Sequence, residues 1–233
     1  MQGTVPERFA LRSRHASVTF QACLVNDSLN TVRPMARTNR VQLAGARYHV
    51  GSRGIRKAPI FLADHEREFF LTLLADIVRR FGWVCEAYCL MSNHYHLAIR
   101  TPEPNIGDGM HRLNGLYAQA FNRWNGFKGH LFEERYWSAI VATEEHVINL
   151  MRYLMLNPVR AGLCTLPHEW RWSSYRATVG LDAKPPFLNT DWVEHAFGAG
   201  RGGAGFRASV LDGLERGVAA PPPYDRHNDG TPM

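Results

Sequence analysis

Apolar residues repeat at helical spacing in three parts of the chain. The first part begins at Asp64, which can act as an N-cap, and ends at Phe81. The second spans 106–124, and the third spans about 144–156 after Thr143, a suitable N-cap. In each part the apolar residues recur every three or four positions, so they share one side of a helix. The pattern therefore predicts three amphipathic helices.

Short apolar runs and alternating positions predict four strands around these helices. They span residues 46–52, 83–90, 94–100 and 136–142. The turn Met91-Ser92-Asn93 joins the second and third strands as a hairpin. Two helices on one face of a small antiparallel sheet would bury the apolar stripes of both. We therefore predict an α+β fold with a ferredoxin-like sheet and helices packed on one face, which leaves the opposite face available for chemistry.

The 233-residue chain is expected to hold one main domain, which we place at residues 35–165. Residues 1–34 show no sustained period and are expected to form an N-terminal arm or extension, with disorder as one option. Residues 166–218 are Trp-rich and are expected to pack on the core as a C-terminal extension. Residues 219–233 combine a proline cluster with a polar ending, which predicts a disordered tail.

His94 and His96 lie two positions apart in the third predicted strand. Side chains alternate between faces along a strand, so both imidazoles leave the same face. Two nitrogens on one face can share a metal ion, while Tyr95 turns back into the apolar layer. Paired strand histidines can also simply bond to backbone groups, so the pair alone leaves both interpretations open.

Tyr153 and Asn157 lie four positions apart in the third predicted helix, hence on the same side of it. If that side meets the face bearing the two histidines, one pocket would hold two imidazoles, a carboxamide and a phenol. These groups are three plausible metal ligands and one nucleophile. Pro158 follows Asn157 directly, so we expect Asn157 at the helix end, with its backbone restricted. The alternative for Tyr153 is ordinary core packing.

Charge is unevenly distributed along the chain, whose net charge is +6. Seven basic residues fall between Ser28 and Leu62, a span without Asp or Glu. Such a stretch favours a phosphate-rich partner, and the alternative is a solvated arm.

Four cysteines, at positions 23, 85, 89 and 164, give no dense disulfide framework, which favours a reduced cytoplasmic setting. No apolar run approaches the roughly 20 residues that a membrane helix needs, and the N-terminus lacks a signal pattern. We expect the protein to stay in the cytosol, without a membrane partner. Cys85 and Cys89, together with His94 and His96, superficially resemble a structural zinc site, which is a less favoured alternative.

Several motifs now stand in a recognisable order. They are ARYHVGSRG, AYCLMSNHYHL, GHLFEERY, RYLMLNPVRAGL and EWRWSSYRA. This order closely resembles the IS200-like single-tyrosine HUH transposases, in particular the REP-associated tyrosine transposases, from about Met35 to Phe197. Ser92 stands where many members have proline. The resemblance implies an HUH endonuclease fold with a catalytic domain at residues 35–165.

The same resemblance implies a role for each residue of the candidate pocket. His94 and His96 would be metal ligands, Tyr153 the nucleophile and Asn157 the third ligand, with Mg²⁺ or Mn²⁺ as the cofactor. The expected activity is metal-dependent cleavage and strand transfer of single-stranded DNA through a covalent 5′-phosphotyrosine. An alternative is a domesticated DNA- or RNA-binding protein with the same fold and no transposition activity.

The expected partner is single-stranded or hairpin DNA, bound by a monomer or homodimer in the cytoplasm at the nucleoid. Basic residues near the first strand and around the second and third helices are candidates to track its backbone. They are Arg47, Arg53, Arg56, Lys57, Arg123, Arg135, Arg152 and Arg160.

Overall fold

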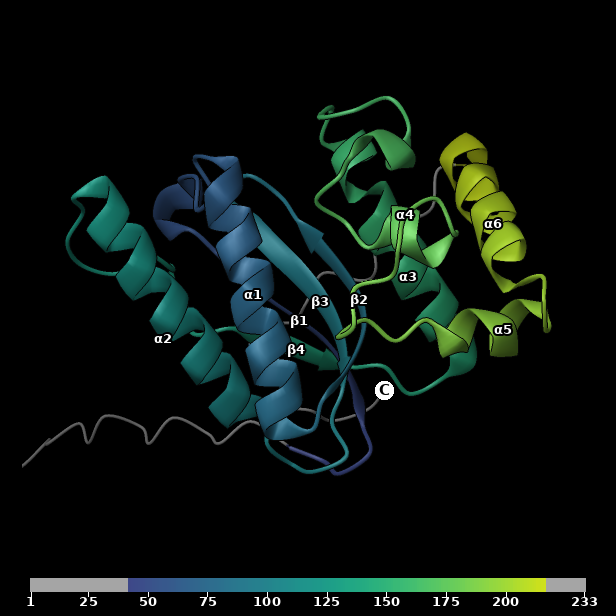
Figure 1. Cartoon of the computed structure of the whole chain (residues 1–233), viewed down its shortest axis with the longest axis horizontal. Coiled ribbons are helices and arrows are strands. Elements are labelled where there is room, and N and C mark those ends of the chain that lie inside the picture. The colour runs from purple at the N-terminus through teal and green to yellow at the C-terminus, as the bar shows by residue number, and fades with distance from the viewer. Residues whose placement is uncertain (1–41, 217–233) are drawn as a thin grey trace, which may run out of the picture. The chain divides into compact units, whose positions relative to one another are not determined.

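The computed structural model describes residues 42–216. Within this range four strands form one antiparallel sheet in the order β2-β3-β1-β4 (Figure 1). They are β1 (Arg47–Arg53), β2 (Val84–Leu90), β3 (His94–Arg100) and β4 (Trp137–Ile140). This order is that of a ferredoxin-like sheet, so the predicted fold class is confirmed. The arm expected at residues 1–34 and the tail expected at 219–233 lie outside the described residues.

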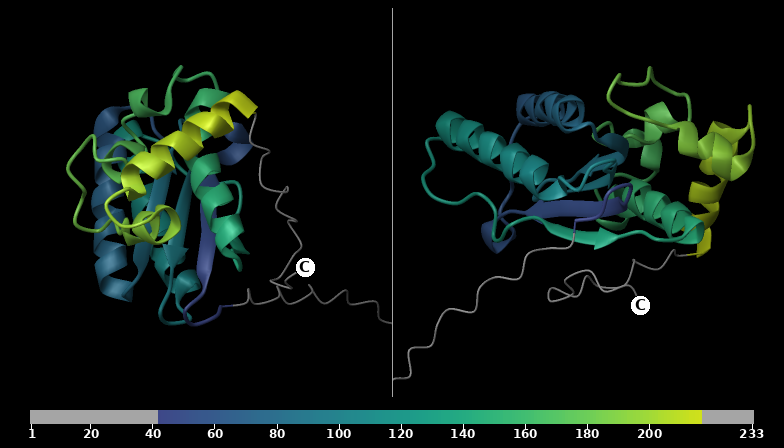
Figure 2. Two further views of the ribbon diagram at one scale, coloured as in Figure 1. Left: turned by 90° about the vertical axis from the view of Figure 1, so that its right-hand side faces the viewer. Right: turned by 90° about the horizontal axis from the view of Figure 1, so that it is seen from below.

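Two helices cover one face of the sheet. They are α1 (Asp64–Phe81) and α2 (Ile106–Asn125), which lie side by side in Figures 1 and 2. Tyr48 and Leu97 on this face join Leu74 of α1 and Leu113 of α2 in one buried apolar cluster. Burying the apolar side of both helices against alternate strand residues removes this surface from water, which is the main favourable contribution to folding.

A third helix, α3 (Glu144–Arg160), lies against the opposite face, and the left view of Figure 2 shows the sheet between α1 and α3. Met151 and Leu154 of α3 form a second buried cluster with Cys89 and Ala98 of the strands. Helix α3 therefore covers much of the face that was expected to be available for chemistry. A site on it must lie where α3 carries polar residues.

The C-terminal end of α3 differs from the prediction. The helix was expected to stop near residue 156, but it continues through Pro158 to Arg160. Proline removes one N–H from the helical hydrogen bonds, and these resume at once, because Ala161 N donates to Asn157 O over 3.0 Å. Asn157 therefore lies within the helix rather than at its end. At the other end Thr143 Oγ1 accepts from His146 N over 3.2 Å, as its predicted role as N-cap requires.

The start of α1 also differs in detail. Asp64 is the first helical residue, and the N-cap position is Ala63. Alanine has no side-chain acceptor for the free N–H groups of the first turn. The carboxylate of Glu66 accepts from the backbone N–H groups of Leu62 and Ala63, which precede the helix. The prediction of Asp64 as N-cap is therefore wrong by one position.

Residues after α3 run along the outer edge of β2. Leu90 N donates to Trp172 O over 2.9 Å, and Ser174 N donates to Tyr88 O over 3.0 Å. The indole N–H of Trp170 donates to Leu90 O, and that of Trp192 donates to Glu86 O, both over 3.1 Å. Backbone groups of β2 that face away from β3 thus have partners within the same chain.

Short helices complete this C-terminal region. They are η2 (Pro167–Glu169), α4 (Tyr175–Thr178), α5 (Asp191–Phe197) and α6 (Gly202–Arg216), while η1 (Ile55–Lys57) follows β1. The sequence did not predict α5 and α6. Glycines between residues 198 and 205 interrupt the apolar pattern where α6 begins, and α5 has only seven residues. Within residues 42–216, no helix combines the length and the apolar character needed to span a lipid bilayer.

Gly51 gives a direct test of the packing on the α3 side of the sheet. A methyl group at this position would overlap the Trp137 ring and the Tyr95 carbonyl oxygen. We expect Gly51→Ala to lower the free energy of unfolding by about 1–3 kcal/mol, the usual cost of overpacking. Urea denaturation followed by circular dichroism measures this change.

Gly115 in α2 is the matched control, because nothing lies within 4 Å of an added methyl group there. Gly115→Ala should leave stability unchanged or raise it by up to about 1 kcal/mol through helix propensity. Equal midpoints for the two variants would contradict the packing described at Gly51.

Candidate functional site

His94 and His96 of β3 both lie on the sheet face that α3 covers. His96 pairs with Gly51 of β1, and His94 pairs with Arg53. Their rings are nearly perpendicular, with centroids 4.9 Å apart. Tyr95, between them, points to the other face, where it is fully buried and its hydroxyl donates to Asn114. The strand alternation predicted from the sequence is therefore present at all three residues.

Helix α3 brings the two predicted helix residues to the same place. The Asn157 Nδ2 atom lies 3.0 Å from His96 Nε2. The Tyr153 ring lies 5.6 Å from the His96 ring, centroid to centroid, in an edge-on arrangement. Two imidazoles, a carboxamide and a phenol thus form one cluster, held by one strand and one helix.

A third histidine belongs to this cluster. His49 of β1 is 2% exposed, and its Nε2 atom lies 3.0 Å from His96 Nδ1. Its ring also meets the ring of Tyr153 at 6.0 Å and that of Trp137 at 4.7 Å. Sequence reasoning placed His49 in the first strand but gave it no role. Because His49 alternates with the apolar residues Tyr48 and Val50, the sequence indicates that its side chain leaves the opposite face of the strand. The pairing of β1 with β3 cannot be read from that pattern.

The orientation of His94 is set by its neighbour in the hairpin. Its Nδ1 atom lies 2.6 Å from Asn93 Oδ1, an acceptor, so Nδ1 carries the proton and Nε2 carries the lone pair. Burial, followed by the positive charge of Arg53, lowers the pKa of His94 to about 4.

Burial also lowers the pKa of His49 and of His96 well below the usual histidine value. All three imidazoles are therefore neutral near pH 7, which is the form that ligates metal ions.

The donor atoms suit Mn²⁺ well and Mg²⁺ tolerably. His94 and His96 offer imidazole nitrogens, and Asn157 can offer its amide oxygen after a half-turn of the carboxamide. Within residues 42–216 no group of three or more His, Cys, Asp or Glu side chains is placed to hold a metal ion. A metal at this place would consequently depend on Asn157 for its third protein ligand.

The zinc alternative is wrong. Cys85 belongs to the apolar cluster on the α1 side of the sheet, whereas Cys89 belongs to the cluster under α3. A β-bulge between Cys85 and Ala87 shifts the register by one residue and separates the two thiols. Burial raises the pKa of both thiols.

Four of the predicted DNA-binding residues lie around the histidine cluster. Arg53 ends β1 opposite His94, and Arg160 lies one turn beyond Asn157, with its guanidinium carbon 5.7 Å from the Tyr153 ring centre. Arg56 and Lys57 are exposed, in left-handed backbone conformations with φ of 53° and 61°. The Asn93 side chain donates to Lys57 O over 3.0 Å, which ties this basic turn to the hairpin that carries His94.

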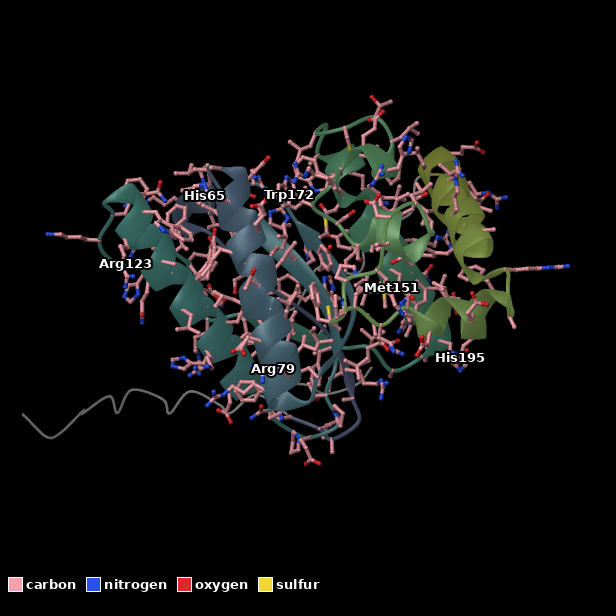
Figure 3. The ribbon with its side chains drawn as sticks, in the orientation of Figure 1. His65, Arg79, Arg123, Met151, Trp172 and His195 are labelled. Atoms are coloured by element: carbon pink, nitrogen blue, oxygen red, sulfur yellow. The ribbon has the colours of Figure 1, made fainter. Side chains whose placement is uncertain are left out.

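The other four predicted DNA-binding residues are placed differently. Arg47 makes a bidentate ion pair with Glu86, a buried carboxylate, so its guanidinium is already engaged. Arg123 lies on the outer side of α2 (Figure 3), Arg135 is exposed shortly before β4, and Arg152 is half-buried on α3. Contact of these residues with DNA stays a prediction.

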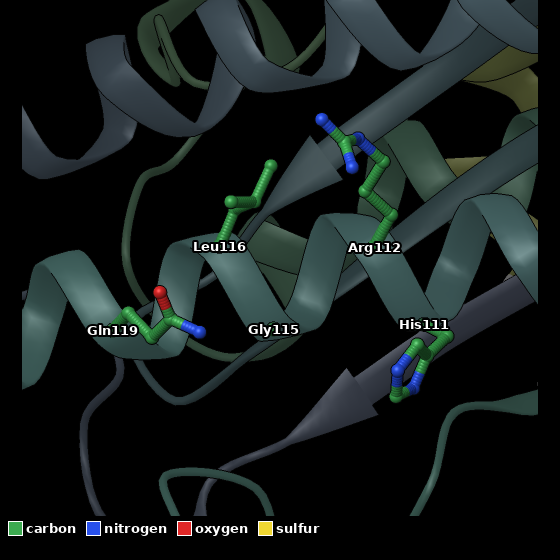
Figure 4. Close-up of a pocket in the computed structure, with 5 residues that line it drawn as sticks. All are labelled: His111, Arg112, Gly115, Leu116 and Gln119. Atoms are coloured by element: carbon green, nitrogen blue, oxygen red, sulfur yellow. The ribbon is translucent and has the colours of Figure 1, made fainter.

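A shallow depression of about 210 Å³ lies along α2 (Figure 4). All its lining residues come from this single helix, which packs on the face of the sheet opposite to His94 and His96. They are His111, Arg112, Gly115, Leu116 and Gln119. We assign no part of the site to it.

Comparison with known proteins agrees with this geometry. The family profile described as "Transposase IS200 like" matches residues 42–157, which begin before β1 and end at Asn157. A Haemophilus influenzae protein that carries the name of a REP-associated tyrosine transposase is 20% identical over 151 residues, covering 57% of this chain and 84% of the relative.

The fold is also similar to the solved structure of a REP-associated tyrosine transposase bound to a REP hairpin. The TM-score is 0.54 at 14% identity, over 66% of this chain and 92% of that one. The match of fold, the order of motifs and the family profile lead to one conclusion: the chain belongs to the IS200-like transposase family and is similar to its REP-associated members.

Proposed function

We propose that the protein is a metal-dependent endonuclease and strand transferase of single-stranded DNA, with Tyr153 as its nucleophile. The observation that supports this most is the meeting of Tyr153 and Asn157 on α3 with His94 and His96 on β3. A protein that only binds nucleic acid has no need for a phenol beside three neutral imidazoles.

The proposed reaction is a transesterification. The Tyr153 hydroxyl oxygen attacks the scissile phosphorus, the bond from phosphorus to the 3′ oxygen breaks, and the phenol's proton is lost while the 3′ oxygen gains one. The products are a 5′-phosphotyrosine and a free 3′-hydroxyl. Because one phosphodiester bond replaces another, a second 3′-hydroxyl can reverse the step at a new junction without ATP.

A phenol has a pKa of about 10, so it needs help to act at neutral pH. A bound Mg²⁺ or Mn²⁺ would supply that help by neutralising charge on the non-bridging phosphate oxygens. His94, His96 and Asn157 would hold this ion. Tyr153, held against the rings of His96 and His49, would then present its hydroxyl to the same phosphate.

Single-stranded or hairpin DNA is the proposed substrate, and the cytoplasm at the nucleoid is the proposed location. The REP hairpin bound to the structurally similar transposase supports a hairpin substrate. Arg160 beside Tyr153, and Arg53, Arg56 and Lys57 beside the hairpin of His94, supply positive charge for phosphates on either side of the scissile one.

Replacing the nucleophile tests the assignment. Tyr153→Phe should reduce the covalent protein–DNA adduct by about 10⁴-fold or more, because no other group replaces the lost oxygen. The adduct is measured by gel shift under denaturing conditions, with single-stranded and hairpin oligonucleotides and Mn²⁺.

Tyr175→Phe, which removes the hydroxyl of a buried tyrosine in α4, is the control and should retain the adduct. An undiminished adduct in Tyr153→Phe would rule out Tyr153 as the nucleophile. Binding without cleavage by the unaltered protein under every metal condition would favour the nucleic-acid-binding alternative.

The third ligand can be tested without DNA. Asn157→Asp should bind Mn²⁺ about 10-fold more tightly, because a carboxylate adds charge to the ligand set, whereas His94→Ala should bind it about 100-fold more weakly. Electron paramagnetic resonance of free Mn²⁺ measures both. Unchanged affinity in both variants would place the ion elsewhere.

The charge around Tyr153 predicts a change in salt dependence. Arg160→Gln removes one phosphate contact and should reduce the slope of log K against log salt by about 0.7 for single-stranded DNA. Arg79→Gln, at an exposed residue of α1 (Figure 3), should leave the slope unchanged. Fluorescence anisotropy with a labelled oligonucleotide compares them, and equal slopes for the two variants would remove Arg160 from the DNA path.

A further inference from the structure

We propose that His49 is a positioning residue that fixes the tautomer of His96 and so directs the His96 Nε2 lone pair toward the ion. This role rests on the proposed function, because it concerns a ligand of that metal site. The arrangement of hydrogen bonds on the two sides of the His96 ring carries the proposal.

His96 has a partner at each ring nitrogen. On one side Asn157 Nδ2 lies 3.0 Å from Nε2, and on the other side His49 Nε2 lies 3.0 Å from Nδ1. An amide nitrogen can only donate, so His96 Nε2 accepts and carries a lone pair. A neutral imidazole has one N–H, which must then be on Nδ1, and this N–H donates to His49 Nε2. The proton of His49 is therefore on its own Nδ1.

The surroundings keep both rings neutral and in place. His49 and His96 are 2% and 4% exposed, and burial lowers the pKa of each well below the usual value. The contacts also oppose a second proton, because it would place an N–H of His96 against the N–H of Asn157 Nδ2, or an N–H of His49 against His96 Nδ1–H. When each ring carries one proton, His96 Nε2 is available to a metal ion only if His49 Nε2 accepts the hydrogen bond from His96 Nδ1–H.

Neighbouring strands leave room for the His49 ring. It pairs with Ala98 of β3 and Ala139 of β4, whose side chains are single methyl groups. The Trp137 ring meets it edge-on at 4.7 Å and lies over Gly51, which has no side chain to displace the indole. These contacts hold the acceptor nitrogen toward His96.

A role for His49 as a further metal ligand fits this geometry poorly. Its Nε2 atom points at His96 Nδ1, which is on the opposite side of that ring from Nε2 and Asn157. An ion bound at His96 Nε2 would consequently have the His96 ring between itself and His49. Metal-bound histidines typically donate their second N–H to a hydrogen-bond acceptor, and loss of that acceptor usually weakens metal binding by about 10- to 100-fold.

The first test reads the tautomers directly in the full chain without metal. Long-range ¹H–¹⁵N correlation spectra near pH 7 should show His96 protonated at Nδ1 and His49 protonated at Nδ1. His96 protonated at Nε2 would overturn the proposal. This measurement needs no active enzyme and no variant that must fold.

The second test uses two replacements of His49. His49→Gln keeps a side-chain oxygen that can accept, and it should bind Mn²⁺ within about 3-fold of the unaltered protein. His49→Phe keeps a ring but no acceptor, so it should bind Mn²⁺ about 10- to 100-fold more weakly and show a mixture of His96 tautomers. His111→Phe, at an exposed residue of α2, is the control and should change neither readout.

Unchanged affinity and an unchanged His96 tautomer in His49→Phe would also overturn the proposal. Failure of the unaltered protein to bind Mn²⁺ or to form an adduct would instead count against the proposed function, while the tautomer spectrum would still decide the role of His49. Urea midpoints for both variants separate loss of fold from loss of positioning.

Discussion

The antiparallel pairing of β1 with β3 is the constraint on which the site depends. It fixes His96 opposite Gly51 and places the His49 ring beside the His96 ring. A shift of one residue would turn His49 to the α1 side of the sheet, because strand side chains alternate between faces. It would also bring a residue with a side chain to the position where Trp137 needs glycine. The fold and the site are therefore fixed by the same register.

Short-range periodicity made much of the site predictable. His94 and His96 are two apart on a strand, and Tyr153 and Asn157 are four apart on a helix, so each pair could be placed on one face from spacing alone. The topology then left one face for both pairs. His49 could not be found in this way, since its contact with His96 spans 47 positions and depends on the register between two strands.

Two further features could not be read from the sequence, for physical reasons. Pro158 indicated a helix end, but a proline costs one hydrogen bond, and the bond from Ala161 N to Asn157 O resumes the helix. The second feature is the ion pair of Arg47, whose guanidinium donates to the carboxylate of Glu86 at the bulge in β2. A bulge leaves no reliable signal in a short apolar run, so this pair could not be foreseen.

The family match ends at Asn157, whereas the described chain continues to residue 216. The continuation has a consequence for how molecules of this protein meet in solution. An uncovered strand edge can recruit a strand from a neighbouring molecule and start aggregation. Here the outward backbone groups of Leu90 and Tyr88 form hydrogen bonds within one molecule. Their partners are Trp170, Trp172 and Ser174. Growth of the sheet from β2 into a neighbouring copy is thereby blocked at these residues.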